Sequence, residues 1–81
     1  MLGVDSRPQL ARKVRLRHDH VRGETLLLFP EGGLRLNSSA ADILKCCDGR
    51  TALEIATGLE APIADVLELL DVLVDRGLLR A

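Results

Sequence analysis

Aromatic side chains are almost absent from this sequence of 81 residues. Phe29 is its only aromatic residue, and tryptophan and tyrosine do not occur. The chain therefore lacks the aromatic platforms on which proteins stack the bases of single-stranded nucleic acid, and it cannot form an aromatic cage for a cationic ligand. Because 47% of the residues are hydrophobic, we expect a core that is almost entirely aliphatic.

Cysteine is also scarce. Cys46 and Cys47 are the two cysteines, and they are adjacent. Neighbouring side chains on a helix point in different directions, so a disulfide between them would be strained. Their spacing is not that of a CxxC redox motif. We therefore predict reduced thiols with no redox or nucleophilic function, in a cytoplasmic protein.

Targeting and membrane-spanning signals are not evident. The first ten residues lack the basic region and apolar stretch of a signal peptide. The longest aliphatic runs are much shorter than the roughly 20 residues that a bilayer-spanning helix needs. We expect no membrane partner.

Residue combinations that support catalysis or metal binding are missing as well. His18 and His20 could share one face of a strand, but two histidines alone make a poor metal site. The pair Gly32–Gly33 is too short for a phosphate-binding loop. We expect a protein that is not an enzyme and that uses no cofactor and no metal.

Charged residues are unevenly distributed, although the net charge is −1. Basic residues dominate the first part of the chain and acidic residues the last part: Arg7, Arg12, Lys13, Arg15, Arg17 and Arg22 against Glu54, Glu60, Asp65, Glu68, Asp71 and Asp75. A net charge near zero does not draw the whole chain toward nucleic acid or anionic lipid. The simplest interpretation is two solvated faces that attract each other weakly.

Three strands are predicted in the first half of the chain. Residues 1–11 show little periodicity and are expected to form a flexible arm without regular structure. Residues 12–18 alternate, with Val14, Leu16 and His18 on one side and basic residues on the other. Residues 24–29 form a run of β-compatible residues that does not alternate and that ends in Leu26-Leu27-Leu28-Phe29, which is typical of a central strand covered on both faces. Residues 34–37 alternate again after a Pro-Gly turn, so the simplest arrangement is an antiparallel meander.

Three helices are predicted in the second half. The first begins at Asn37, Ser38 or Ser39, which are good N-caps, and ends at Asp48–Gly49. The second covers residues 52–57, with a capping box formed by Thr51 and Glu54, and is closed by Gly58. The third covers residues 62–76 and ends at Gly77. Residues 12–81 are therefore predicted to form a single α+β domain, a three-stranded antiparallel sheet packed on a three-helix bundle in a winged-helix-like layout.

The third helix has an apolar face and an acidic face. At about 100° per residue, six aliphatic side chains share one arc, while Glu68, Asp71 and Asp75 lie opposite. Leu69 and Val72 lie toward one flank, in line with Arg76. Val72 has two interpretations, a scattered surface aliphatic or part of an apolar flank reserved for a partner.

Several residues form a pattern with a family resemblance. They are Pro30-Glu31-Gly32, Leu36-Asn37, Ser39-Ala40, Ile43-Leu44, Asp48-Gly49, Thr51, Ile55, Asp65-Val66, Leu69 and Gly77-Leu78. Across residues 7–80 the chain resembles the PqqD family of small proteins of pyrroloquinoline quinone biosynthesis. The resemblance implies a RiPP recognition element, a peptide chaperone that binds a ribosomal precursor peptide (PqqA-like) and presents it to a radical S-adenosylmethionine enzyme (PqqE-like).

The resemblance also implies where the peptide binds. In this family the peptide adds as a strand beside the third strand, in the cleft that this strand makes with the third helix. Transferred to this sequence, the resemblance places the backbone partners of the peptide at Leu34, Arg35 and Leu36. It places side-chain contacts on a flank of the third helix, with Leu69, Val72, Leu73 and Arg76 as candidates. The sequence supports an exposed edge here, because residues 34–37 contain no proline and one charge.

Two alternative functions stay open. A winged-helix layout is also typical of DNA-binding regulators, but helices that carry Glu54, Asp65, Glu68, Asp71 and Asp75 would repel phosphate, so we expect no nucleic-acid partner. A structural dimerisation module is the other alternative, in which the exposed edge pairs with a second copy. The sequence leaves a homodimer open.

Overall fold

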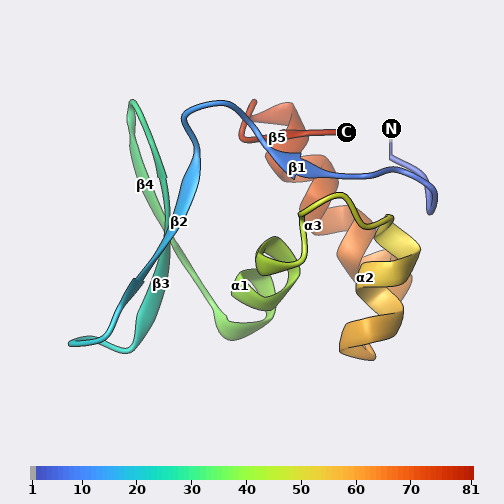
Figure 1. Ribbon diagram of the computed structural model, residues 1–81, viewed down its shortest axis with the longest axis horizontal. Coiled ribbons are helices and arrows are strands. Elements are labelled where there is room, and N and C mark those ends of the chain that lie inside the picture. Colours follow the sequence, from blue (N-terminus) through green and yellow to red (C-terminus); the bar gives the residue numbers. More distant parts are fainter. Residues whose placement is uncertain (1) are drawn as a thin grey trace.

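The computed structural model describes residues 2–81 of the chain. A three-stranded sheet forms one layer, and three helices cover one of its faces (Figure 1). The elements in chain order are β1 (Gln9–Leu10), β2 (Arg15–Asp19), β3 (Glu24–Phe29), β4 (Gly32–Leu36), α1 (Ser38–Lys45), α2 (Ala52–Leu59), α3 (Ile63–Asp75) and β5 (Leu79–Arg80). The predicted fold class, an antiparallel three-stranded sheet on three helices, is confirmed.

β3 is the central strand of the sheet, with the order β2-β3-β4 and antiparallel pairing on both sides. Its bounds are those predicted from the sequence. The prediction that both of its faces are covered is wrong. Thr25 and Leu27 are buried against the helices, whereas Leu26 and Leu28 on the opposite face are only half-buried. The reason is that all three helices lie on the same side of the sheet, with α1 packed against β3 and β4 (Figure 1).

The two flanking strands start and end at other residues than predicted. β2 begins at Arg15 because the preceding residues turn: Lys13 has a positive φ of 70°, and the Val14 N–H donates to the Ala11 carbonyl over 3.0 Å. β4 begins at Gly32 and ends at Leu36, one residue before the predicted end. Asn37 is already the N-cap of α1.

α1 starts as predicted and stops early. The Asn37 Oδ1 atom accepts a hydrogen bond from the Ala40 N–H at 2.8 Å, as an N-cap does. The helix ends at Lys45, with Cys46 as its C-cap, so the predicted stop at Asp48–Gly49 is wrong. Gly49, with a φ of 112°, instead lies in the loop after the helix. Asp48 in the same loop forms an isolated β-bridge with Gln9.

α2 has the predicted capping box. The Thr51 N–H donates to Glu54 Oε1 at 2.8 Å, and the Glu54 N–H donates to Thr51 Oγ1 at 3.1 Å. The prediction that Gly58 closes this helix is wrong, since the helix runs to Leu59 and Glu60 takes the left-handed conformation with a φ of 53°. The Ala61 N–H, which donates to the Ala56 carbonyl at 2.9 Å, completes this end of the helix.

α3 ends in the predicted way. Gly77 adopts a φ of 76°, its N–H donates to the Val74 carbonyl, and the Leu78 N–H donates to the Leu73 carbonyl, both at 2.9 Å. This pair of hydrogen bonds is a Schellman motif. The central residues of the helix join the core, which consists of Leu27, Ile43, Leu44, Cys47, Ala52, Ile55, Ala56, Val66, Leu70, Leu73, Leu78 and Leu79.

The segment before Arg12 contains regular structure, contrary to prediction. Gln9 and Leu10 form β1 and pair with Arg80 and Leu79 of β5. The prediction of an unstructured arm is therefore wrong for these two residues, because a partner strand from the far end of the chain determines their conformation. Met1 lies outside the described residues. The flexibility of the arm and the start of the peptide-binding domain at Arg12 stay predictions.

Candidate functional site

β4 forms one edge of the sheet. It pairs with β3 and, within residues 2–81, with no other strand. The Arg35 side chain carries the one charge on the strand, and its Nε atom lies 3.0 Å from Glu24 Oε2 of β3. This ion pair holds the guanidinium over the outer face of the sheet, the face away from the helices. The backbone edge of β4 is thus lightly protected against pairing with an added strand.

The register of β4 decides which backbone groups face outward. Pro30 and Glu31 form a two-residue loop, closed by the pair Phe29–Gly32. In such a hairpin the closing pair is hydrogen-bonded, and hydrogen-bonded and non-hydrogen-bonded pairs alternate from there. The backbone groups of Leu34 therefore face β3, whereas those of Arg35 face the open edge.

This register divides the three predicted strand residues into two groups. Leu36, like Leu34, uses its backbone groups toward β3, while its side chain is half-buried on the side of the helices. Of the three predicted strand residues, Arg35 is the one whose backbone groups face the open edge of the sheet. Gly33 shares that orientation, because it lies two residues before Arg35 on the same strand. Our sequence reasoning missed Gly33, although the two-residue loop was a signal that could have located it.

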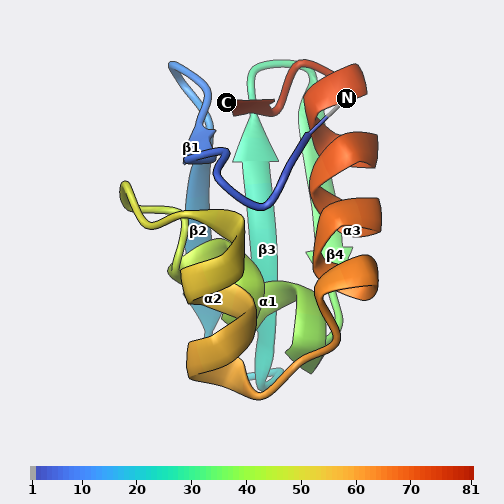
Figure 2. The same cartoon turned by 90° about the vertical axis from the view of Figure 1, so that its right-hand side faces the viewer.

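α3 lies on the β4 side of the molecule, with β2 on the opposite side (Figure 2). Leu34, Leu36 and Leu69 are partly buried and pack against a core that includes Leu73. The edge strand and the helix thus contribute aliphatic side chains to one common core.

The four predicted residues of α3 differ in accessibility. Leu73 is only 4% exposed, so it supports the core and offers little surface to a ligand. Leu69 is half-buried, and Arg76 is exposed. Val72 is 46% exposed, which makes it the accessible aliphatic residue of this flank.

The N-terminal segment also reaches α3 close to Val72. The Leu2 N–H donates to Asp71 Oδ1 at 3.3 Å. Our sequence reasoning missed this contact, because nothing in the local sequence around Leu2 indicates a partner on a helix that follows much later in the chain.

Metal-ligating side chains are not gathered in the described part of the chain. No set of three or more His, Cys, Asp or Glu side chains in residues 2–81 could hold a metal ion. The rings of His18 and His20 lie 4.6 Å apart, centroid to centroid, in a T-shaped arrangement. Burial raises the pKa of the Cys47 thiol from 9.0 to about 12, with further contributions from Cys46 and Asp48, so Cys47 is protonated at neutral pH.

A comparison with known families bears on this site. The model of the family described as "Coenzyme PQQ synthesis protein D (PqqD)" matches residues 24–79, from the start of β3 to the first residue of β5. This chain belongs to the PqqD family. The family resemblance found in the sequence is thereby confirmed. The matched part of the PqqD family includes the edge strand β4 and the whole of α3.

Relatives in the PqqD family align over most of this chain. A "PqqA binding protein" of Xanthomonas axonopodis pv. citri (strain 306) is 39% identical over 85 residues, which cover 94% of this chain and 92% of the relative. A "PqqA binding protein" of Rhizobium meliloti (strain 1021) is 38% identical over 65 residues, which cover 74% of this chain and 66% of the relative. The chain thus spans about two thirds of the Rhizobium protein.

A solved structure has the same PqqD fold. It is the solution NMR structure of the PqqD truncation of Methylobacterium extorquens PqqCD, described as a functional and stand-alone RiPP recognition element. It matches this chain with a TM-score of 0.74 and 30% identity, and the match covers 100% of this chain and 96% of that one.

One finding concerns membranes. Within residues 2–81, no helix has both the length and the apolar character needed to cross a bilayer.

Proposed function

We propose that this chain binds the ribosomal precursor peptide of pyrroloquinoline quinone biosynthesis and presents it to a radical S-adenosylmethionine enzyme. The observation that carries the proposal is the open backbone edge of β4 on the same side as α3, in a member of the PqqD family. Further support comes from the relatives, which are named for binding PqqA, and from the similar structure, which is described as a recognition element.

The proposed binding mode is strand addition. An extended segment of the peptide pairs with the outward backbone groups of Gly33 and Arg35, and each hydrogen bond contributes on the order of 1 kcal/mol. Leu69, Val72 and Arg76 contact the side chains of the peptide, while Leu34, Leu36 and Leu73 form the aliphatic support behind them. Affinity then comes chiefly from the backbone, and specificity comes from the α3 flank.

We infer a cytoplasmic binding protein that is not an enzyme and that uses no cofactor and no metal. Its partners are the PqqA-like peptide and the PqqE-like enzyme. A DNA-binding function is disfavoured by the surface of α3, where Asp65, Glu68 and Asp75 are exposed and would repel phosphate.

Titration with a synthetic PqqA-like peptide, followed by amide chemical shifts, tests the proposal. We expect shift changes in Gly32–Asn37 and in Leu69–Arg76. Changes confined to Arg15–Asp19 of β2 would mean that the peptide binds elsewhere, and no saturable change at all would contradict the peptide-binding function.

A further inference from the structure

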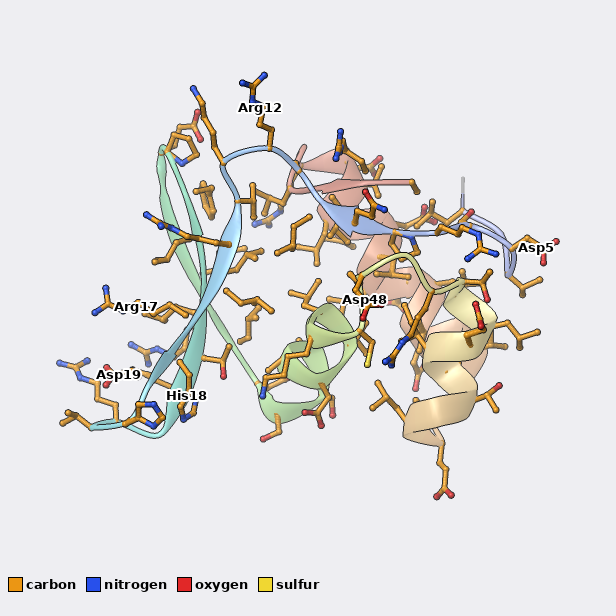
Figure 3. All side chains as sticks on the ribbon, in the orientation of Figure 1. Asp5, Arg12, Arg17, His18, Asp19 and Asp48 are labelled. Atoms are coloured by element: carbon orange, nitrogen blue, oxygen red, sulfur yellow. The ribbon has the colours of Figure 1, made fainter. Side chains whose placement is uncertain are left out.

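The outer face of the sheet carries side chains that the peptide site does not use. The register places Arg17, Leu26 and Arg35 side by side across the three strands, and Arg15 beside Leu28 in the next row. Because Thr25 and Leu27 at the alternate positions of β3 are buried, these side chains lie on the face away from the helices. Figure 3 shows Arg17 pointing away from the helical layer.

This outer face has unpaired positive charge. Within residues 2–81, Arg15 and Arg17 form no ion pair. The two acidic groups on the same face are already engaged: Glu24 pairs with Arg35 at 3.0 Å and with Arg22 at 3.9 Å, and Asp19 Oδ1 accepts from the Val21 and Arg22 N–H groups at 3.0 and 3.3 Å. The two free guanidinium groups are available to an external acid.

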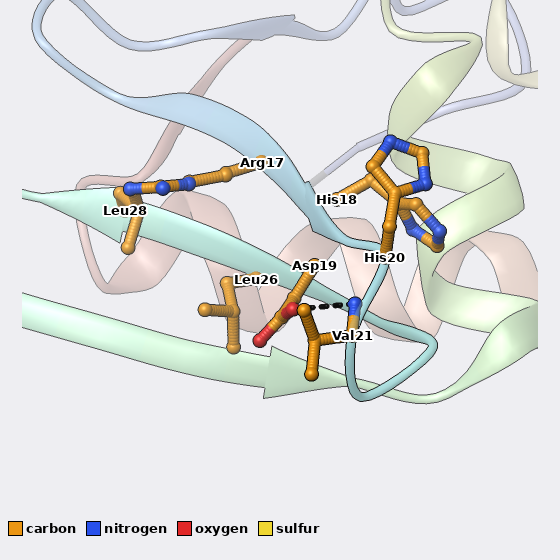
Figure 4. A pocket seen from close by; sticks show the side chains of 7 residues that line it. All are labelled: Arg17, His18, Asp19, His20, Val21, Leu26 and Leu28. Carbon is orange, nitrogen blue, oxygen red and sulfur yellow. Dashed lines mark hydrogen bonds between the residues drawn. The ribbon is translucent and has the colours of Figure 1, made fainter.

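The guanidinium groups of Arg15 and Arg17 lie around an apolar surface formed by Leu26 and Leu28. Leu28 lines a hollow of about 450 Å³ together with Arg17, Leu26 and Val21 (Figure 4). It also lines a neighbouring hollow of about 350 Å³ with Arg15 and Arg17. Leu26 and Leu28 are half-buried, and Val21 at the tip of the hairpin is 96% exposed. Aliphatic side chains framed by guanidinium groups are complementary to a protein surface that presents carboxylates around aliphatic groups.

Nucleic acid fits this face less well. Its floor consists of Leu26 and Leu28, which offer no aromatic surface to bases. The net charge of the chain is −1, and the acidic surface of α3 repels phosphate at longer range. The favoured occupant is therefore a protein.

We propose that the outer face of the sheet docks an acidic surface of the modifying enzyme while the β4 edge holds the precursor peptide. This inference rests on the proposed function, because a chain that presents a peptide must contact the peptide and the enzyme at the same time. The two surfaces do not overlap: the peptide adds along the edge of β4, and the enzyme contacts Arg15, Arg17, Leu26 and Leu28 on β2 and β3. Arg35 and Glu24 lie at the boundary.

The double variant Arg15→Glu/Arg17→Glu tests this surface in the full chain. Both side chains are exposed, so the fold is expected to persist. The matched control, Arg50→Glu/Arg80→Glu, changes the net charge by the same amount at exposed positions outside the three-stranded sheet, where Arg50 pairs with the exposed Asp48 at 3.4 Å. The two probes are the intact PqqE-like enzyme of the same pathway, measured by surface plasmon resonance, and the synthetic PqqA-like peptide, measured by calorimetry.

We expect the Arg15/Arg17 variant to lose at least about tenfold in affinity for the enzyme, and to bind the peptide within about twofold of the unchanged chain. The control should keep both affinities. Raising the salt concentration should weaken enzyme binding by the unchanged chain more than enzyme binding by the variant.

Several results would overturn the inference and leave the peptide site standing. They are unchanged enzyme affinity in the Arg15/Arg17 variant, equal loss in the control, or no enzyme binding by a chain that binds the peptide. Loss of self-association in the variant by sedimentation would assign the face to a second copy, and loss of salt-resistant duplex DNA binding would assign it to nucleic acid. Failure of the unchanged chain to bind the peptide would instead contradict the proposed function.

Discussion

Arg35 and Glu24 form an ion pair across the two strands of the β3–β4 hairpin, with 3.0 Å between Nε and Oε2. The pair keeps the one charged side chain of β4 on the outer face, while the backbone N–H of Arg35 points to the open edge. Side chain and backbone of the same residue therefore have separable functions, which two substitutions can distinguish.

Arg35→Pro should weaken peptide binding and Arg35→Ala should not. Proline removes an outward N–H donor, which costs about 1 kcal/mol, or about fivefold in affinity. Proline is tolerated on an edge strand where the N–H faces solvent, so the fold should remain. Alanine keeps the backbone N–H and removes an ion pair whose arginine is exposed, and Glu24 keeps Arg22 as a partner at 3.9 Å. Calorimetric titration with the PqqA-like peptide measures the affinity, and thermal unfolding checks the fold; equal affinity for the two variants would place the peptide elsewhere.

Val72→Asp should weaken peptide binding by about 1–2 kcal/mol if the peptide covers this side chain, because the carboxylate would lose solvation. The matched control is Leu53→Asp on α2, since Leu53 is 48% and Val72 46% exposed. The control should bind the peptide normally. If both variants bind like the unchanged chain, Val72 is a scattered surface aliphatic.

Asn37→Ala should lower the free energy of unfolding by about 1 kcal/mol, because the Ala40 N–H loses its partner at the start of α1. Ser39→Ala is the control: Ser39 was an alternative cap in the sequence, but its side chain makes no hydrogen bond in the described chain. Urea unfolding compares the two. A larger loss for Ser39→Ala would mean that the helix begins later.

Removal of residues 1–8 should destabilise the fold by about 2 kcal/mol or more. The carbonyls of Ser6 and Val4 accept from the N–H groups of Ala52 and Leu53 at 2.8 and 3.0 Å, in the first turn of α2 where such donors lack helical partners. Pro8 is fully buried and is lost too. A deletion of residues 1–3 keeps both carbonyls and should cost less. Urea unfolding of both truncations measures this, and an unchanged midpoint for the longer deletion would support an independent, flexible arm.

Iodoacetamide should modify Cys46 at neutral pH and leave Cys47 intact until the chain unfolds. Cys46 is half-buried, whereas Cys47 is buried and its Sγ donates to the Ile43 carbonyl at 3.4 Å. Since the folded-state pKa of Cys47 is raised from 9.0 to about 12, the unfolded chain releases this proton first. The contribution of Cys47 to stability is therefore complete below pH 9.0 and is lost as the pH rises toward about 12. Mass spectrometry of labelled peptides checks the reactivity, and rapid labelling of Cys47 in the folded chain would contradict the burial.

Elements with local signals were predictable. The bounds of β3, the N-cap at Asn37, the capping box of Thr51 and Glu54, and the stop of α3 at Gly77 each depend on side chains within a few residues of one another. The same is true of the motif that identified the family. The α3 flank was only partly predictable: helical spacing placed Val72 on a flank apart from the apolar arc, but it left open whether that side chain serves a partner. Leu73, which the resemblance offered as a peptide contact, is buried.

The class of fold, the PqqD family and an accessible third strand were readable from the amino-acid sequence, because they follow from local chemistry and short motifs. The pairing of β1 with β5, the one-sided cover of β3 and the early end of α1 became visible in the three-dimensional fold. Each of these depends on contacts between segments far apart in the chain. The outward direction of the Arg35 backbone belongs to the same group, because it is fixed by the register with β3.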